Sequence, residues 1–136
     1  MIKLIFCLWR APSLSREAFQ QYWLEIHAPL VRRHSAALRI RRYVQSHGFS
    51  DPSLARTAEI RNGDNEPFDG VAELWWDSLD DIVRAGDTRE GRAAGRALLA
   101  DERNFIDLSR STLTYAMERE IISPEISEGS EQPSKA

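Results

Sequence analysis

Two histidines and a tyrosine occur where a small protein could use them to move protons. His27 follows Tyr22 and Trp23 in the stretch FQQYWLEIHAPL, which reads as a helix as far as residue 26. Tyr43 and His47 occur in IRRYVQSHGF, which reads as a strand. An imidazole with a pKa of about 6.5 takes or gives a proton near neutrality, and a phenol donates a hydrogen bond to an oxygen that gains negative charge. These side chains are suited to acid–base chemistry.

The helix must hold His27 at the edge of its buried face. Its apolar positions share one side of a helical wheel: Phe19, Trp23, Ile26 and Leu30. Tyr22 lies on one edge of that side and His27 on the other. Pro29 has no N–H and crowds the preceding turn, so we expect a kink or restart near His27, with Ala28 outside α geometry and a backbone carbonyl left free. His27 could equally be a buried structural histidine bonded to that carbonyl.

The second strand carries a row of polar side chains. Tyr43, Gln45 and His47 alternate onto one face, where a small fold is expected to bury apolar groups. Glu73 and Trp75 form a similar mixed pair in a later strand. The alternative is an exposed face or a hydrogen-bonded dimer interface, and we favour that interpretation for Gln45 and Glu73.

Four strands and two helical regions must position these residues. Short apolar, β-rich runs predict strands at residues 2–9, 40–49, 70–77 and 111–122. Helices are predicted from about residue 16 and across 78–108, the second one broken near Gly86 and Gly91. The order β-α-β-β-α-β predicts an α+β, ferredoxin-like fold with an antiparallel sheet over residues 1–122. The polar stretch 50–69 is expected to be a lid or a disordered insertion, with SLARTAEI as a candidate for one helical turn, and residues 123–136 a disordered tail.

The sheet should have one face that its own helices do not cover. In the first strand both alternating sets of side chains are mainly apolar, and the fold places both helices on a single face. A monomer would leave apolar surface in water. We therefore expect a homodimer that packs sheet to sheet, although the pattern does not select which strand face meets the partner.

The composition narrows the class of function. The chain has 136 residues, 42% of them hydrophobic and 29% charged, with a net charge of −3, so we expect no nucleic-acid partner. A single cysteine excludes an internal disulfide, and no metal-ligand spacing or glycine-rich dinucleotide loop occurs, so no metal and no cofactor are expected. No membrane span or clear signal peptide is visible, and we expect a cytoplasmic protein without a membrane partner.

Several segments together resemble the EthD family. They are MIKLIFCLWRAPSLSREAFQQYWLEIHAPL with its Y-W-x-x-x-H-x-P-L core, then RRYVQSH, FDGVAELWWDSLDD and EGRAAGRALLADERNFID. The resemblance implies a dimeric α+β barrel. It also implies kinship with proteins that accompany a cytochrome P450 system in ether degradation, and with fungal dehydratases of aromatic polyketides.

The resemblance also bears on individual residues. Muconolactone-isomerase relatives of this fold have a histidine at the position of His27 and a tyrosine at that of Tyr43. Their second histidine, after the second strand, has no counterpart between residues 49 and 69, and His47 is the nearest substitute.

The leading interpretation is a cofactor-independent acid–base enzyme of the dehydratase, cyclase or isomerase type, acting on a small hydrophobic molecule that is aromatic or cyclic. His27 would move the proton, Tyr43 would stabilise a developing enolate or carbonyl oxygen, and His47 would be a second acid–base or orienting group. Tyr22, Trp23 and Trp75 would form the aromatic walls of the binding site. The alternative is a non-catalytic carrier or accessory protein, or an oxidoreductase-associated component, of an oxidative degradation system.

Overall fold

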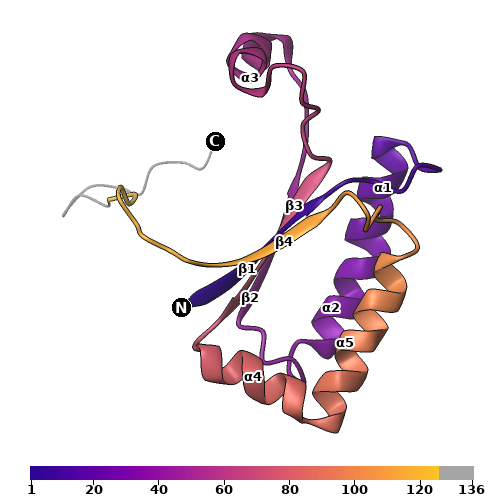
Figure 1. The fold of residues 1–136 in the computed structure, drawn as a ribbon, viewed down its shortest axis with the longest axis vertical. Coiled ribbons are helices and arrows are strands. Elements are labelled where there is room, and N and C mark those ends of the chain that lie inside the picture. Colours follow the sequence, from indigo (N-terminus) through magenta and orange to yellow (C-terminus); the bar gives the residue numbers. More distant parts are fainter. Residues whose placement is uncertain (126–136) are drawn as a thin grey trace.

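Strands that are distant in the sequence pair into one four-stranded antiparallel sheet (Figure 1). The computed structural model describes residues 1–125. The strands are β1 (Ile2–Leu8), β2 (Arg42–His47), β3 (Gly70–Trp76) and β4 (Thr112–Met117). Their order across the sheet is β2-β3-β1-β4, which is the order of a ferredoxin-like fold. The predicted fold class is confirmed.

Helices cover one face of this sheet, as Figure 1 shows. A long helix follows β1 and is built from α1 (Arg16–Tyr22), η1 (Trp23–His27) and α2 (Ala28–His34). The connection from β3 to β4 carries α4 (Leu79–Asp87) and α5 (Arg89–Glu102). The buried core between the layers consists of Leu8, Phe19, Trp23, Ala72, Phe105 and Ile106. Its aromatic rings fix the long helix and the end of α5 against the sheet.

The break in the second helical region falls at Thr88, between the two glycines that predicted it. Thr88 caps α5 by accepting a 2.9 Å hydrogen bond from the Gly91 N–H. A Cβ on Gly91 would lie 1.8 Å from the Ala85 carbonyl oxygen, so the turn needs glycine there. Gly86 lies inside α4, and a Cβ there would meet nothing within 4 Å.

The stretch between β2 and β3 is partly helical, in the region of the candidate helical turn. It contains a short 3₁₀ turn, η2 (Pro52–Leu54), and α3 (Ala55–Asn62), which has no buried residues. Figure 1 shows α3 beyond one end of the sheet and α4 at the other end. The segment is therefore ordered, and it does not lie as a lid over the space between α4, α5 and the sheet.

The helix-free face of the sheet is partly apolar and carries one polar cluster. Ile5, Cys7 and Val71 lie on this face, as their strand pairing requires. Lys3 Nζ lies 2.6 Å from Glu73 Oε2 on the same face. β4 ends at Met117, earlier than predicted, and residues 118–125 form no helix or strand. Of the predicted tail, 126–136 lie outside the described residues.

Candidate active site

The long helix passes through His27 by means of a π-helical turn. The Ala28 N–H donates to the Trp23 carbonyl, five residues earlier, and Ala28 keeps helical angles (φ −58, ψ −44). The predicted displacement of Ala28 from α geometry is therefore wrong, whereas the predicted irregularity near His27 is present as this π-turn. A wider turn accommodates the missing N–H of Pro29 without ending the helix, and such turns are frequent at functional sites. His27 is turned inward and is 5% exposed.

The carbonyl oxygen of the π-turn accepts a second hydrogen bond, from the sheet. Gln45 Nε2 donates to the Trp23 carbonyl at 2.9 Å and also lies 2.9 Å from the Tyr43 hydroxyl. Its amide oxygen lies 2.8 Å from His47 Nε2, which must then carry the proton. The predicted row of Tyr43, Gln45 and His47 is thus a hydrogen-bonded chain that faces the helices. Gln45 does not lie on the exposed or interface face that we favoured for it.

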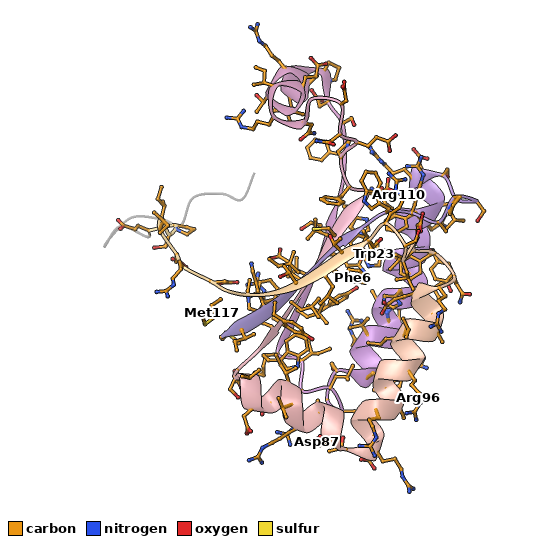
Figure 2. All side chains as sticks on the ribbon, viewed as in Figure 1. Phe6, Trp23, Asp87, Arg96, Arg110 and Met117 are labelled. Atoms are coloured by element: carbon orange, nitrogen blue, oxygen red, sulfur yellow. The ribbon has the colours of Figure 1, made fainter. Side chains whose placement is uncertain are left out.

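Trp23 packs against the end of this row. Its ring centroid is 4.6 Å from that of His47, and a Cβ at Gly70 of β3 would approach the ring to 2.5 Å. Figure 2 shows Trp23 and Phe6 between the sheet and the helices. Burial lowers the pKa of His47. Burial raises the pKa of Tyr43, with hydrogen bonds opposing it, so the phenol is a neutral donor at physiological pH.

His27 is paired with a carboxylate of α5, 74 residues further along the chain. Its Nδ1 lies 2.7 Å from Asp101 Oδ2, and the Tyr22 hydroxyl donates to Asp101 Oδ1 at 2.6 Å. Asn104 Nδ2 approaches both the Tyr22 oxygen and Asp101 Oδ1 at 3.3 Å. Burial works to raise the pKa of Asp101, but the hydrogen bonds from Tyr22, His27 and Asn104 outweigh it, and this pKa lies below its usual value.

This pairing fixes the tautomer of His27. Burial lowers the pKa of His27 and outweighs the opposing effect of Asp101, so the imidazole is neutral near pH 7. An ionised Asp101 only accepts hydrogen bonds, so the proton must be on Nδ1 and the lone pair on Nε2. Within residues 1–125, Nε2 has no hydrogen-bond partner, and no fully buried polar side-chain atom lacks one. Nε2 is therefore reachable from outside the core. The Phe105 ring, 4.9 Å away, packs against the imidazole.

A pocket of about 500 Å³ lies between the sheet and helices α4 and α5. We call it the sheet–helix pocket. Its wall is mainly apolar, and its lining includes Phe6, Leu74, Trp76, Leu98, Glu102 and Tyr115. Gly86, Gly91 and Gly95 form part of the helical wall. A pocket of this size can hold a drug-sized molecule.

Glu102 is the carboxyl group in this wall. It is the last residue of α5 and follows Asp101, which holds His27. Burial, helped by the neighbouring Asp101 charge, raises the pKa of Glu102 to about 7. Its charge in turn reaches Tyr43, whose pKa it raises further. His27, Tyr43 and His47 are not among the residues that line this pocket.

The structure brings most of the predicted site residues together in one layer. His27, Tyr22 and Trp23 lie on the long helix, and Tyr43 and His47 face them from β2. Trp75 does not join them, because Tyr43 pairs with Leu74 and Trp75 therefore points to the opposite face of the sheet. There the Arg42 guanidinium lies 4.6 Å from its ring and Glu118 accepts its indole N–H.

Sequence reasoning missed Asp101, Glu102 and Asn104. They occur in a polar stretch at the end of a helix, ADERNF, which looks like a solvated helix terminus. The one available signal was the position of Phe105 and Ile106 directly after them, because a buried pair there draws the preceding residues toward the core.

Two negative observations apply to residues 1–125. No group of three or more histidine, cysteine, aspartate or glutamate side chains is placed to hold a metal ion. Within the same residues, none of the helices has both the length and the apolar character that crossing a bilayer requires.

The comparisons with known proteins agree with the resemblance seen in the sequence. The EthD domain matches residues 11–109. A protein of Claviceps purpurea named "Decarboxylase" is 23% identical over 88% of this chain and 84% of its own length. "Dehydratase aurZ" of Gibberella zeae is 24% identical over 90% of this chain and 80% of its own length.

Solved structures show the same fold. An EthD family protein of Bacillus halodurans has a TM-score of 0.57 and 24% identity, covering 88% of this chain and 99% of that one. A dimeric protein of ferredoxin-like fold from Bacteroides fragilis has a TM-score of 0.51 and 13% identity, covering 85% of this chain and 93% of that one. Because the EthD domain spans most of the chain, this protein belongs to the EthD family.

Proposed function

We propose that this protein is a lyase-type acid–base enzyme that uses its own side chains on a small, ring-bearing hydrophobic molecule. The observation that carries the proposal is the His27–Asp101 pair, which fixes the proton on Nδ1 and leaves the Nε2 lone pair reachable, while burial keeps the imidazole neutral. A neutral imidazole of fixed tautomer is a general base. The names of the two fungal relatives support a reaction that breaks a bond without oxidation.

In this proposal His27 removes a proton from a carbon next to a carbonyl group. The Tyr43 hydroxyl donates a hydrogen bond to the carbonyl oxygen as it gains charge, and its raised pKa keeps it protonated for that role. His47 and Gln45 hold Tyr43 in place through the hydrogen-bonded row. The apolar part of the ligand occupies the sheet–helix pocket, whose lining includes Glu102, the neighbour of Asp101, but neither His27 nor Tyr43, so a substrate must extend from the pocket to reach them.

The proposal is tested without knowing the natural substrate. β-Tetralone has exchangeable protons next to its ketone, and NMR in D₂O measures how fast the protein replaces them with deuterium. The wild type should accelerate exchange over buffer, and His27→Asn should lose about 100- to 10,000-fold of the acceleration. His34→Asn, the same change at the end of α2, is the control and should keep it. Equal exchange by wild type and His27→Asn would contradict the proposal.

A carrier that binds the same molecule without chemistry remains the alternative. It needs the sheet–helix pocket but not a reachable Nε2. Native mass spectrometry that finds β-tetralone retained by the wild type and by His27→Asn alike, with exchange no faster than in buffer, would favour the carrier.

We further propose that the protein is a homodimer that packs through the helix-free face of the sheet. Ile5, Cys7 and Val71 are only partly buried on that face, and in residues 1–125 no helix covers it. The described dimer of Bacteroides fragilis supports this assembly for the same fold. Burial of such a face contributes about 25 cal/mol per Å² of apolar area. Light scattering coupled to size exclusion gives the mass directly, and a monomer would contradict the assembly.

A further inference from the structure

Gln45 lies between the π-turn of the long helix and the two other polar side chains of β2. Its Nε2 donates to the Trp23 carbonyl at 2.9 Å, and the same nitrogen donates to the Tyr43 hydroxyl oxygen at 2.9 Å. Its Oε1 lies 2.8 Å from His47 Nε2. Both N–H groups of the amide and its oxygen therefore have partners inside the protein, so Gln45 is placed to act through its neighbours.

The Trp23 carbonyl decides which way the Gln45 amide points. A carbonyl oxygen only accepts hydrogen bonds, so the amide nitrogen, and not the amide oxygen, must face it. This carbonyl also accepts a hydrogen bond from the Ala28 N–H, which closes the π-turn. The turn that carries His27 is therefore joined to β2 through the Gln45 amide.

This orientation of the amide restricts the hydroxyl proton of Tyr43. The Tyr43 oxygen accepts one N–H of Gln45, so its own proton must point in another direction. Among residues 1–125 no acceptor takes a hydrogen bond from this hydroxyl, since the Gln45 contact uses it as an acceptor. The proton is therefore available to an acceptor that comes from outside the protein.

The same amide fixes the tautomer of His47. Gln45 Oε1 only accepts, so His47 Nε2 must carry a proton. Burial lowers the pKa of His47, so near neutrality the ring holds this one proton and Nδ1 keeps its lone pair. The ring also packs on Trp23, with the two centroids 4.6 Å apart. A neutral His47 in this tautomer holds the Gln45 amide in place and adds no charge to the row.

We propose that Gln45 is a positioning residue, which turns the hydroxyl proton of Tyr43 toward the substrate by occupying the Tyr43 oxygen with one of its own N–H groups. The inference rests on the proposed function, in which that proton forms a hydrogen bond to a carbonyl oxygen that gains charge. A donor whose direction is set before the substrate binds costs no reorganisation during the reaction. Gln45 acts through Tyr43 and needs no contact with the substrate.

A double-mutant cycle separates this role from a structural one. Gln45→Leu removes the N–H donors, and β-tetralone exchange should fall about tenfold or more in kcat with little change in KM. Tyr43→Phe should lose at least as much. Gln45→Leu in the Tyr43→Phe background should then have little further effect, because no hydroxyl proton is left to direct. Damage to the π-turn would instead slow exchange by the same factor in both backgrounds.

The matched control is Gln21→Leu. Gln21 lies on the exposed side of α1, where its amide contacts only Glu25 among the described residues. The same substitution there should keep the wild-type kcat and KM.

Nitrogen-15 NMR of the histidine rings gives a readout that does not depend on activity. In the wild type the neutral ring of His47 should carry its proton on Nε2, and in Gln45→Leu this preference should be lost. The opposite tautomer in the wild type would overturn the inference, even where Gln45→Leu does not fold.

The exchange data distinguish failure of this inference from failure of the proposed function. Acceleration by the wild type that is equal in Gln45→Leu, or that falls by the same factor in both backgrounds of the cycle, would overturn the inference alone and leave His27 as the base. No acceleration by the wild type would remove the proposed function, and the inference with it.

Discussion

His27 Nδ1 and Asp101 Oδ2 lie 2.7 Å apart although 74 residues separate them in the chain. This contact joins the π-turn of the long helix to the end of α5 and gives the imidazole one defined tautomer, while burial keeps the imidazole neutral. The adjacent Glu102 lines the sheet–helix pocket. One helix end therefore orients the proposed base and contributes a carboxyl group to the pocket wall.

Replacement of Asp101 should change the basicity of His27 in a defined direction. The Asp101 carboxylate raises the pKa of His27, although burial keeps it below 6.5 overall. In Asp101→Asn this support is lost, so the pKa of His27 should fall further and β-tetralone exchange should slow by about tenfold or more. NMR titration of the His27 ring measures the pKa. Asp80→Asn, on the exposed side of α4, should change neither. A higher pKa of His27 in Asp101→Asn would contradict the assigned contact.

Glu102 should make the protein less stable as the pH rises. Its folded-state pKa of about 7 lies above the usual 4.5, so the native state holds the proton more tightly than the unfolded chain between these values. The stabilisation is complete below pH 4.5 and is lost as the pH rises through 7. Glu102→Gln should therefore exceed wild type in free energy of unfolding by at most about 3 kcal/mol at about pH 8, and match it at low pH. Urea unfolding at the two pH values measures this, and parallel pH curves for both proteins would refute it.

Filling the sheet–helix pocket should remove ligand binding and keep the fold. Gly95 lies in the pocket wall, and a Cβ there meets nothing within 4 Å, so Gly95→Leu fits without backbone change. It also replaces a poor helix former in α5, which is worth up to about 1 kcal/mol. Fluorescence titration with anilinonaphthalene sulfonate should show binding to wild type and to Ala93→Leu, but about tenfold weaker binding to Gly95→Leu. Undiminished binding would place the dye site elsewhere.

The packing of Trp23 against β3 should depend on the absence of a side chain at Gly70. A Cβ at Gly70 would lie 2.5 Å from the Trp23 ring, so Gly70→Ala must displace this ring, which packs against His47. We expect a loss of about 1–3 kcal/mol in the free energy of unfolding. Gly86→Ala, where the added methyl meets open space, should be neutral or slightly stabilising. Equal effects of the two substitutions in thermal unfolding would contradict the described packing.

A charge on the helix-free face should separate the proposed dimer. Ile5→Asp introduces an unpaired carboxylate into that face, and the mass from light scattering should fall to that of one chain. Val83→Asp makes the same kind of change on an exposed position of α4 and should leave the mass unaltered. An unchanged mass in Ile5→Asp would move the interface to another surface. Met117 is not suitable for this test, because it pairs with Ile2 on the helix-covered side of the sheet.

The fold, and the site residues on the long helix and β2, could be predicted from the sequence. Alternating apolar residues and the order of the elements predicted the sheet, and helical spacing predicted that His27 lies at the edge of a buried face. Pro29 predicted an irregular turn but not its type. A π-turn and a kink can each accommodate a residue that has no N–H to donate. Trp75 and Trp76 are adjacent, so only the register with β2 decides which one shares a face with Tyr43.

The site residues at the end of α5 depend on contacts between distant segments, which local sequence patterns do not predict. Asp101 reaches His27 only after α5 has packed against the long helix, and Glu102 acquires its environment from β1, β3 and β4. Both residues look like ordinary solvated charges when read along the chain. A burial-dependent pKa cannot be read from a single helix, because it is a property of the assembled layers.

The pH–rate profile of β-tetralone exchange tests the central claim, that neutral His27 acts as the base, most directly. The protein-catalysed rate should rise with pH to a plateau, with a single inflection below pH 6.5 that coincides with the pKa of the His27 ring measured by NMR. His34→Asn should give the same profile, and His27→Asn should lose the plateau. A protein-dependent rate that rises in proportion to hydroxide with no plateau, or an inflection that persists in His27→Asn, would contradict the account.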